Sequence, residues 1–336
     1  MRFSNVILCL LSVATVGAAS LVGCGSDTGG NTGGESSTSS SSGTTTSTGS
    51  SMTYPCSPGA SCKAADKECI GLVDNAGQAK FGLRMSELGV TAPTALTAGL
   101  VAGIVSGAVT PSNAGCNLNG SATFNWLMQF DTAASTLKTG GAKPVTDPTT
   151  GYDFVNEMVN GKQLQPVTFD GVKPDASGKF TVTTGKDLLV PIYLDPGATQ
   201  VVLLPLKNAR LSMGTLSASQ NCIGHYNAEN LDPANSCLGD AATKSFITAG
   251  QLDGFITLED ADTVVISSLK QTLCVLLSQD ASTYGELDMT DMITKCKRTG
   301  GTINFTGDTC STAGGTCKDA VNLSAQFAAS SVKINN

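Results

Sequence analysis

Residues 122–131 read ATFNWLMQFD, and this stretch decides the expected fold class. Its large apolar residues occupy every second position, namely Phe124, Trp126, Met128 and Phe130. Asn125 and Gln129 stand between them and fall on the opposite face. A period of two residues is typical of a β-strand with one face in the core, so we expect the lone tryptophan to be buried.

Further strands are predicted on the C-terminal side. Residues 188–206 read LLVPIYLDPGATQVVLLPL, with two apolar runs on either side of a Pro-Gly turn, which indicates a hairpin. Pro191 and Pro205 favour edge strands or bulges. The other candidate strands are residues 180–185, 253–266, 272–278, 301–307 and 330–334. Many short strands joined by glycine turns predict a mainly β domain, either a β-sandwich or a jelly-roll-like fold.

Residues 94–109 differ from this pattern. They read TALTAGLVAGIVSGAV and place Gly99, Gly103 and Gly107 four residues apart. In membranes this spacing lets helices approach closely, which would suit a membrane-inserting element. The uncharged run is short for a membrane span. A small-residue helix or buried strands within the domain is therefore the favoured interpretation.

The cysteine content indicates an exported protein. Cys9 lies in the N-terminal apolar run and Cys24 directly follows that run; ten other cysteines are Cys56, Cys62, Cys69, Cys116, Cys222, Cys237, Cys274, Cys296, Cys310 and Cys317. An even number in an exported chain predicts disulfides, and the absence of C-x2-C pairs argues against zinc. Local pairs are the simplest expectation: Cys222–Cys237, Cys274–Cys296 and Cys310–Cys317, with the first four cysteines pairing among themselves. The sequence leaves this connectivity open.

The N-terminus has the layout of a secretory signal. Arg2 supplies a positive charge, and residues 6–22 carry none. The junction Leu21-Val22-Gly23-Cys24 resembles the lipobox of bacterial lipoproteins. That resemblance implies a signal peptide over residues 1–23, with diacylglycerol on the Cys24 sulfur and a further acyl chain on its new amino group. Several acyl chains anchor a protein firmly to a membrane without spanning it.

Several segments of the chain support the same placement. Residues 68–88, 124–131, 199–224 and 252–266 resemble segments of uncharacterised lipoproteins from myxobacteria-like Gram-negative bacteria. No activity follows from this resemblance. In Gram-negative lipoproteins an Asp after the lipidated cysteine tends to retain the protein at the inner membrane, and here that residue is Gly25. The resemblance therefore implies an outer-membrane lipoprotein and leaves open which face of the membrane carries it.

Residues 24–54 form the predicted link between anchor and domain. Ser, Thr and Gly dominate from residue 25 onward, so the segment cannot bury enough apolar surface to fold. A flexible coil of this length spans on the order of 30 Å. The sequence thus predicts a signal peptide, a lipidated disordered linker, and a disulfide-rich domain over residues 55–336.

Charge and composition exclude some functions. Removing residues 1–23 would remove one charge, that of Arg2, and change the formal net charge from −7 to −8. An acidic chain is a poor ligand for nucleic acid or for anionic lipid. The expected partner is therefore the membrane, through the lipid anchor, and no nucleic acid.

Few residues suggest catalysis. His225 is the only histidine, and neither G-x-S-x-G nor H-E-x-x-H occurs. The densest acidic cluster is Asp253, Glu259, Asp260 and Asp262. Carboxylates near a turn are candidate calcium ligands, although solvated turn residues are the favoured interpretation. No other cofactor is expected.

The sequence favours a tethered binding or structural module with an unidentified ligand over an enzyme. The alternative is a secreted polysaccharide hydrolase that uses paired carboxylates, which lie about 5–10 Å apart in such enzymes.

Overall fold

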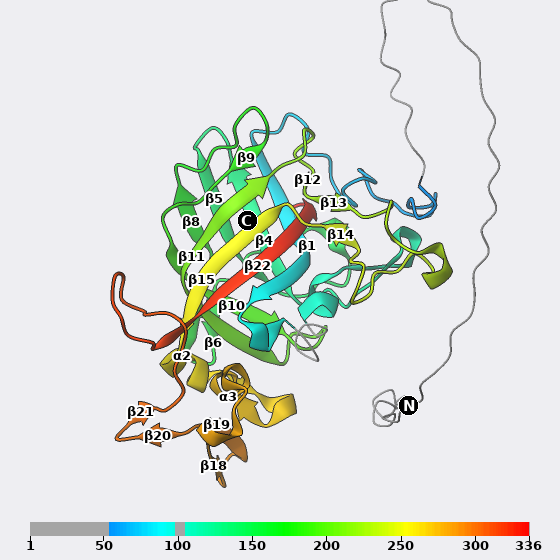
Figure 1. Cartoon of the computed structure of the whole chain (residues 1–336). Coiled ribbons are helices and arrows are strands. Elements are labelled where there is room, and N and C mark those ends of the chain that lie inside the picture. Colours follow the sequence, from blue (N-terminus) through cyan, green and yellow to red (C-terminus); the bar gives the residue numbers. More distant parts are fainter. Residues whose placement is uncertain (1–53, 98–104, 336) are drawn as a thin grey trace, which may run out of the picture. The chain divides into compact units, whose positions relative to one another are not determined.

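One curled antiparallel sheet organises the computed structural model, which describes residues 54–97 and 105–335 (Figure 1). The predicted signal peptide, Cys24, nearly all of the linker, Gly99 and Gly103 lie outside these residues. In spatial order the main strands are β10 (Lys186–Tyr193), β11 (Val201–Thr215), β15 (Gly250–Thr257), β22 (Ala320–Ser331), β1 (Lys80–Ala92), β4 (Asn125–Asp131), β5 (Thr136–Ala142) and β8 (Val167–Asp170). Two short strands, β9 (Lys179–Phe180) and β12 (Cys222–Ile223), complete the ten by pairing with β11 and β22.

The curl of this sheet brings its two halves together. Gly141 on β5 lies so close to Pro191 on β10 that a Cβ at residue 141 would approach the proline ring to 2.3 Å. The inward faces of the two halves share one large core, which includes Phe81, Phe130 and Phe327. The mainly β, disulfide-braced fold is therefore confirmed.

Smaller elements flank the main sheet. A four-stranded sheet contains β16 (Val265–Ile266), β17 (Gln271–Thr272), β19 (Ile293–Cys296) and β18 (Tyr284–Asp288). Four two-stranded pairs are β2 (Ser112–Asn113) with β3 (Leu118–Asn119), β6 (Glu157–Val159) with β7 (Lys162–Leu164), β13 (His225–Tyr226) with β14 (Phe246–Ile247), and β20 (Arg298–Thr299) with β21 (Thr302–Ile303). The 3-10 turns are η1 (Thr94–Leu96), η2 (Ala114–Cys116), η3 (Pro148–Thr150), η4 (Pro233–Asn235), η5 (Ser267–Leu269) and η6 (Ala281–Thr283). Residues 105–109 are helical.

The strand prediction around Trp126 and the hairpin prediction are confirmed, whereas the predicted strands 180–185 and 301–307 are mostly irregular. Trp126, Met128 and Phe130 enter the large core from one face of β4, and Phe124, the residue just before β4, belongs to the same core. The predicted hairpin is formed by β10 and β11, in which Pro191 pairs with Leu203. Strand β10 is an edge of the sheet, as proline requires.

Two predicted strand segments fold instead as short helices, α2 (Leu258–Thr263) and α3 (Leu273–Ser278). The Thr257 hydroxyl accepts a hydrogen bond from the Asp260 N–H (3.1 Å), and acidic residues fill the first turn of α2. Both features stabilise a helix N-terminus. The α3 run is apolar on nearly every side, so its periodicity could not distinguish a buried helix from a buried strand.

Five disulfides brace the fold: Cys56–Cys237, Cys62–Cys116, Cys69–Cys222, Cys274–Cys296 and Cys310–Cys317. The last two pairs are confirmed, whereas the predicted Cys222–Cys237 pair is wrong. Only Cys62–Cys116 joins two of the first four cysteines. The reason is tertiary: the Asn221 amide donates to Asp66 (3.0 Å) and to Asp74 (3.1 Å), which holds Cys222 beside Cys69.

The described residues belong to one compact unit, residues 52–336. All five bridges and all four apolar clusters lie within residues 52–336. Residues 52–336 therefore contain the disulfides and the apolar contacts that stabilise the fold. Among the described residues, no helix is long and apolar enough to cross a membrane.

Candidate functional site

An apolar cavity of about 180 Å³ lies inside the curled sheet. Its walls come from β1, β4, β10, β11, β15 and β22, and from the segment 264–276 that carries α3. The lining is almost entirely aliphatic, with Phe124 and Trp126 as its aromatic members. Ser268 is its one polar residue. A cavity with these walls offers a ligand apolar contact and almost no hydrogen bonding.

The strand alternation explains why apolar side chains converge here. Leu188, Val190 and Ile192 point inward from β10, and Leu204 and Leu206 do so from β11. On β1 the register shifts between Met85 and Glu87, as in a β-bulge. Because of this shift, Met85 and Leu88 both line the cavity, although they are three residues apart.

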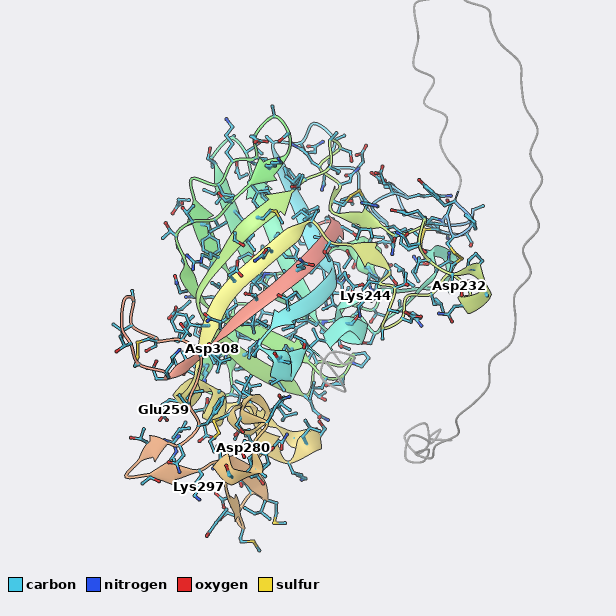
Figure 2. All side chains as sticks on the ribbon, in the orientation of Figure 1. Asp232, Lys244, Glu259, Asp280, Lys297 and Asp308 are labelled. Carbon is cyan, nitrogen blue, oxygen red and sulfur yellow. A yellow bond between two sulfur atoms is a disulfide. The ribbon has the colours of Figure 1, made fainter. Side chains whose placement is uncertain are left out.

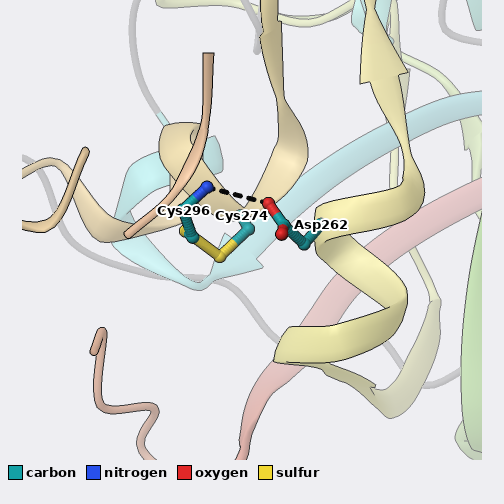
Figure 3. A group of neighbouring side chains, drawn as sticks. All are labelled: Asp262, Cys274 and Cys296. Atoms are coloured by element: carbon teal, nitrogen blue, oxygen red, sulfur yellow. Dashed lines mark hydrogen bonds between the residues drawn. A yellow bond between two sulfur atoms is a disulfide. The ribbon is translucent and has the colours of Figure 1, made fainter. Parts of the chain in front are cut away.

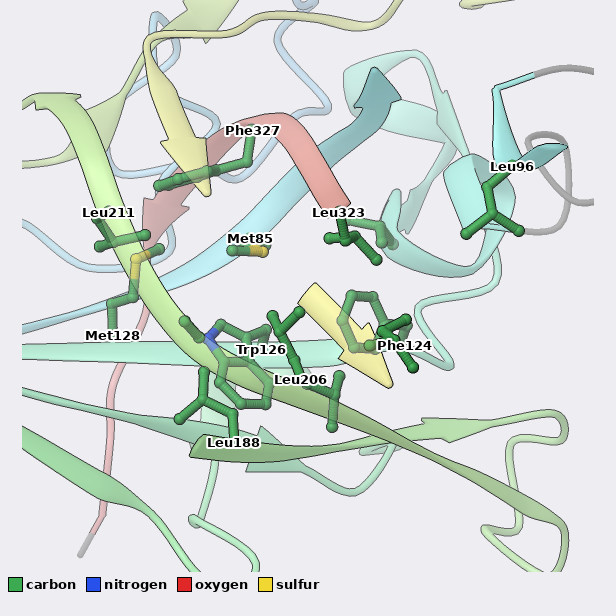
Figure 4. Close-up of a cluster of buried hydrophobic side chains, with 14 of the residues drawn as sticks. Met85, Leu96, Phe124, Trp126, Met128, Leu188, Leu206, Leu211, Leu323 and Phe327 are labelled. Atoms are coloured by element: carbon green, nitrogen blue, oxygen red, sulfur yellow. The ribbon is translucent and has the colours of Figure 1, made fainter. Parts of the chain in front are cut away.

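The cavity runs from a buried base to an open mouth. Trp126 and Leu206, at 6% and 1% exposure, form part of the base (Figure 4). Leu194 is 43% exposed, and Ser268 is also exposed, so the lining of the cavity reaches the surface at these two residues, which we call the mouth. A ligand inside the cavity would thus contact Trp126, the only tryptophan of the chain.

The wall segment 264–276 is held in place by a buried carboxylate on the preceding helix, α2. Asp262 accepts hydrogen bonds from the Thr272 hydroxyl (3.0 Å), the Cys296 N–H (2.9 Å) and the Arg298 guanidinium (2.9 Å). The Cys274–Cys296 bridge joins α3 to β19 directly beside Asp262 (Figure 3). Since both cysteines are oxidised, this group offers no thiolate to a metal. Its role is to fix the segment that covers the cavity.

The four candidate calcium ligands do not converge on one point. Glu259 and Asp262 both pair with Arg298 (2.8 and 2.9 Å). Asp260 lies 4.0 Å from Lys207, and Asp253 accepts from the Ser324 hydroxyl (2.8 Å) on the neighbouring strand. Among the described residues, no three of these carboxylates lie close enough together to hold one ion.

His225 and the carboxylates that line the cavities are the groups on which the hydrolase alternative would depend. His225 hydrogen-bonds to Glu229 (3.1 Å), and no serine hydroxyl bonds to it among the described residues. In four cavities of the described residues, Glu87 is the only carboxylate in the lining. None of the four therefore presents a pair of carboxylates.

Glu87 occupies a polar pocket on the other face of β1. It is 2% exposed, and its carboxylate accepts a hydrogen bond from the Ser106 hydroxyl (3.1 Å). The Ser106 hydroxyl in turn accepts from Lys244 (3.4 Å), which is labelled in Figure 2 and precedes β14 in the sequence. Burial raises the pKa of Glu87 to about 7, although Lys244 and Ser106 act to lower this pKa. Because Val105 and Ala108 line the apolar cavity, this link fastens helix 105–109 to β1.

We expect the stability of the domain to depend on the protonation of Glu87. Its folded-state pKa of about 7 lies above its ordinary value of 4.5. The folded state then binds a proton that the unfolded state releases, so the free energy of unfolding falls as pH rises from about 4.5 to about 7. The contribution lost is on the order of 3 kcal/mol. Urea unfolding at a series of pH values should show this fall in the wild type and a flatter profile for Glu87→Gln.

Glu286→Gln, which changes an exposed carboxylate, is the control and should keep the wild-type profile. An unchanged pH slope in Glu87→Gln would contradict the assignment.

The cavity was not predicted from the sequence. The alternation of apolar residues in β10 and β11 predicts that one face of each strand is buried. It does not predict whether the side chains on that face fill the interior completely. No family model, no curated protein and no solved structure matches this chain.

Proposed function

We propose that this protein is an exported binding module that holds an apolar ligand in the cavity of its curled sheet. The observation that carries the proposal is the almost purely apolar lining, with Ser268 as its single polar member. Protein interiors are normally close-packed, with few voids larger than a water molecule. A cavity lined by aliphatic and aromatic groups stays dry and accepts apolar guests.

The proposal includes a tether to the outer membrane. The lipobox-like Leu21-Val22-Gly23-Cys24 and the Ser/Thr/Gly segment after it support a lipid anchor on Cys24. A tethered binding module near a bilayer would meet apolar molecules at high local concentration.

Binding is tested by energy transfer from Trp126 to 1-N-phenylnaphthylamine, using residues 52–336. We expect saturable transfer at one dye per chain, because Trp126 lies at the base of the cavity. Ala325→Leu adds atoms inside the cavity and should weaken binding at least tenfold, since Ala325 is one of the lining residues.

Ala329→Leu is the matched control. Ala329 lies on the same strand and is as deeply buried as Ala325, but it does not line the cavity. Overpacking there costs about 1–3 kcal/mol of stability and leaves the cavity itself unchanged. Equal dye affinity in the two folded variants would overturn the proposed site.

The anchor has its own prediction. Cys24→Ser removes the thiol that forms the thioether, so incorporation of a fatty-acid analogue should be lost completely and the signal should remain uncut by the lipoprotein peptidase. Labelling followed by membrane fractionation measures both effects. A variant that is labelled and fractionates as the wild type does would show that the anchor lies elsewhere.

A further inference from the structure

We propose that the ligand of the cavity is a single-chain amphiphile, which enters tail first and leaves its polar head at Leu194 and Ser268. This inference rests on the proposed function and adds the chemical class and the orientation of the ligand. Three features of the cavity carry it: its size, its lack of charge, and the direction in which its exposure increases.

The size of the cavity suits one narrow chain. Its volume is about 180 Å³. A cavity of about 150 Å³ in another protein accommodates benzene, whereas pockets for drug-sized molecules measure about 300–1,000 Å³. Two acyl chains side by side would not fit in this space. The terminal part of one flexible chain would fit, with the rest of the molecule toward the mouth.

The chemistry of the walls excludes a buried polar head. No charged side chain lines the cavity. Burying a polar group without a hydrogen-bond partner is unfavourable in proteins, and burying an isolated charge is far more unfavourable. A ligand with a polar head would therefore place that head at Ser268 and in water.

The gradient of exposure sets the orientation. The base is formed by residues such as Trp126, Met85 and Leu206, at 6%, 2% and 1% exposure. The mouth is formed by Leu194, at 43% exposure, and by the exposed Ser268. A chain that enters from the mouth therefore brings its methyl end closest to Trp126 and its head closest to Leu194.

The lone tryptophan allows a direct test of this orientation. Bromine atoms quench tryptophan fluorescence on contact, so fatty acids brominated near the methyl end, in mid-chain or near the carboxyl end report which part lies at Trp126. Residues 52–336 are titrated with each acid. We expect quenching that is strongest for the methyl-end bromines and several times weaker for the carboxyl-end bromines.

A relocated tryptophan provides the matched control. The double variant Trp126→Phe with Leu194→Trp moves the single reporter from the base to the mouth. The order of quenching should then reverse, with the carboxyl-end bromines strongest. Near-ultraviolet circular dichroism and thermal melting verify that the variant is folded.

The nature of the head and the number of chains are tested in parallel arms. Because the head lies outside, brominated lysophosphatidylcholine should quench in the same order as the free acids. Brominated diacyl phosphatidylcholine, presented in vesicles, should not quench Trp126.

The outcomes separate the two proposals. Absence of quenching by every brominated amphiphile would overturn the proposed function itself. Quenching in the same order for both tryptophan positions would leave binding intact and overturn the tail-first orientation. Strong quenching by the diacyl lipid would overturn the single-chain class.

Discussion

Replacing Cys56, Cys237, Cys69 and Cys222 together with alanine is expected to leave the domain unfolded at room temperature. Each of these bridges closes a large ring, since the cysteines of the two pairs are 181 and 153 residues apart in the sequence. In the chain-entropy treatment, the first bridge across such a separation contributes about 5 kcal/mol. A second bridge then closes a ring of about 28 residues and adds about 3–4 kcal/mol. The combined loss is comparable to the whole stability of a typical domain, about 5–15 kcal/mol.

The free energy that each bridge contributes depends on whether the other bridge is present, and this gives a second expected result. Removing either pair alone leaves the other in place, so each single loss should cost only the smaller contribution of about 3–4 kcal/mol. Cys310→Ala with Cys317→Ala is the control, because its cysteines are 7 residues apart and the bridge is worth about 2 kcal/mol. Guanidinium unfolding at constant pH compares the four variants with the wild type. If the variant that lacks all four of these cysteines were fully folded, that result would contradict the claim that the two bridges hold the segment carrying Cys56 and Cys69.

Arg84→Met is expected to cost at least about 3 kcal/mol of stability, since it leaves several buried acceptors without a donor. Arg84 lies on β1 and is 3% exposed. Its guanidinium donates to the side chain of Asn125 and to the carbonyl oxygens of Met85 (2.8 Å), Val109 (2.8 Å) and Phe124 (3.4 Å). These bonds join β1 to β4 and to the end of helix 105–109, next to the cavity.

The electrostatics of Arg84 make this position unusual. Burial lowers the pKa of Arg84, and no carboxylate forms an ion pair with it among the described residues. The guanidinium lies 5.9 Å from the centre of the Tyr152 ring. Arg84→Lys keeps the charge but cannot reproduce the planar fork, so we expect it to be destabilising as well, although less than methionine. Wild-type stability of Arg84→Met in urea unfolding would refute the structural role of these bonds.

How far the sequence predicts this fold depends on how local the signal is. The alternation around Trp126 and the Pro-Gly turn between β10 and β11 are local features, and both were predicted. The bounds of the longest strands were only partly predicted from the sequence. β22 runs over Ala320–Ser331, and its small residues, such as Ala325 and Ala329, give a weak hydrophobic pattern.

The features that were missed depend on the tertiary structure. The Cys69–Cys222 pairing follows from hydrogen bonds of Asn221 to Asp66 and Asp74, which no sequence spacing reveals. The acidic cluster is divided because Arg298 and Lys207 approach from distant parts of the chain. The cavity arises from the curl of the sheet, which brings Leu188 and Leu206 opposite Met85 and Leu323.

The central claim is that the curled sheet encloses a dry apolar cavity that accepts an apolar ligand. The most direct test is a crystal structure of residues 52–336 under xenon pressure, because xenon binds in dry apolar cavities. The account predicts xenon density among Trp126, Leu206 and Leu323, with no ordered water at that position. A water-filled site, or walls collapsed so that no xenon is bound there, would contradict it.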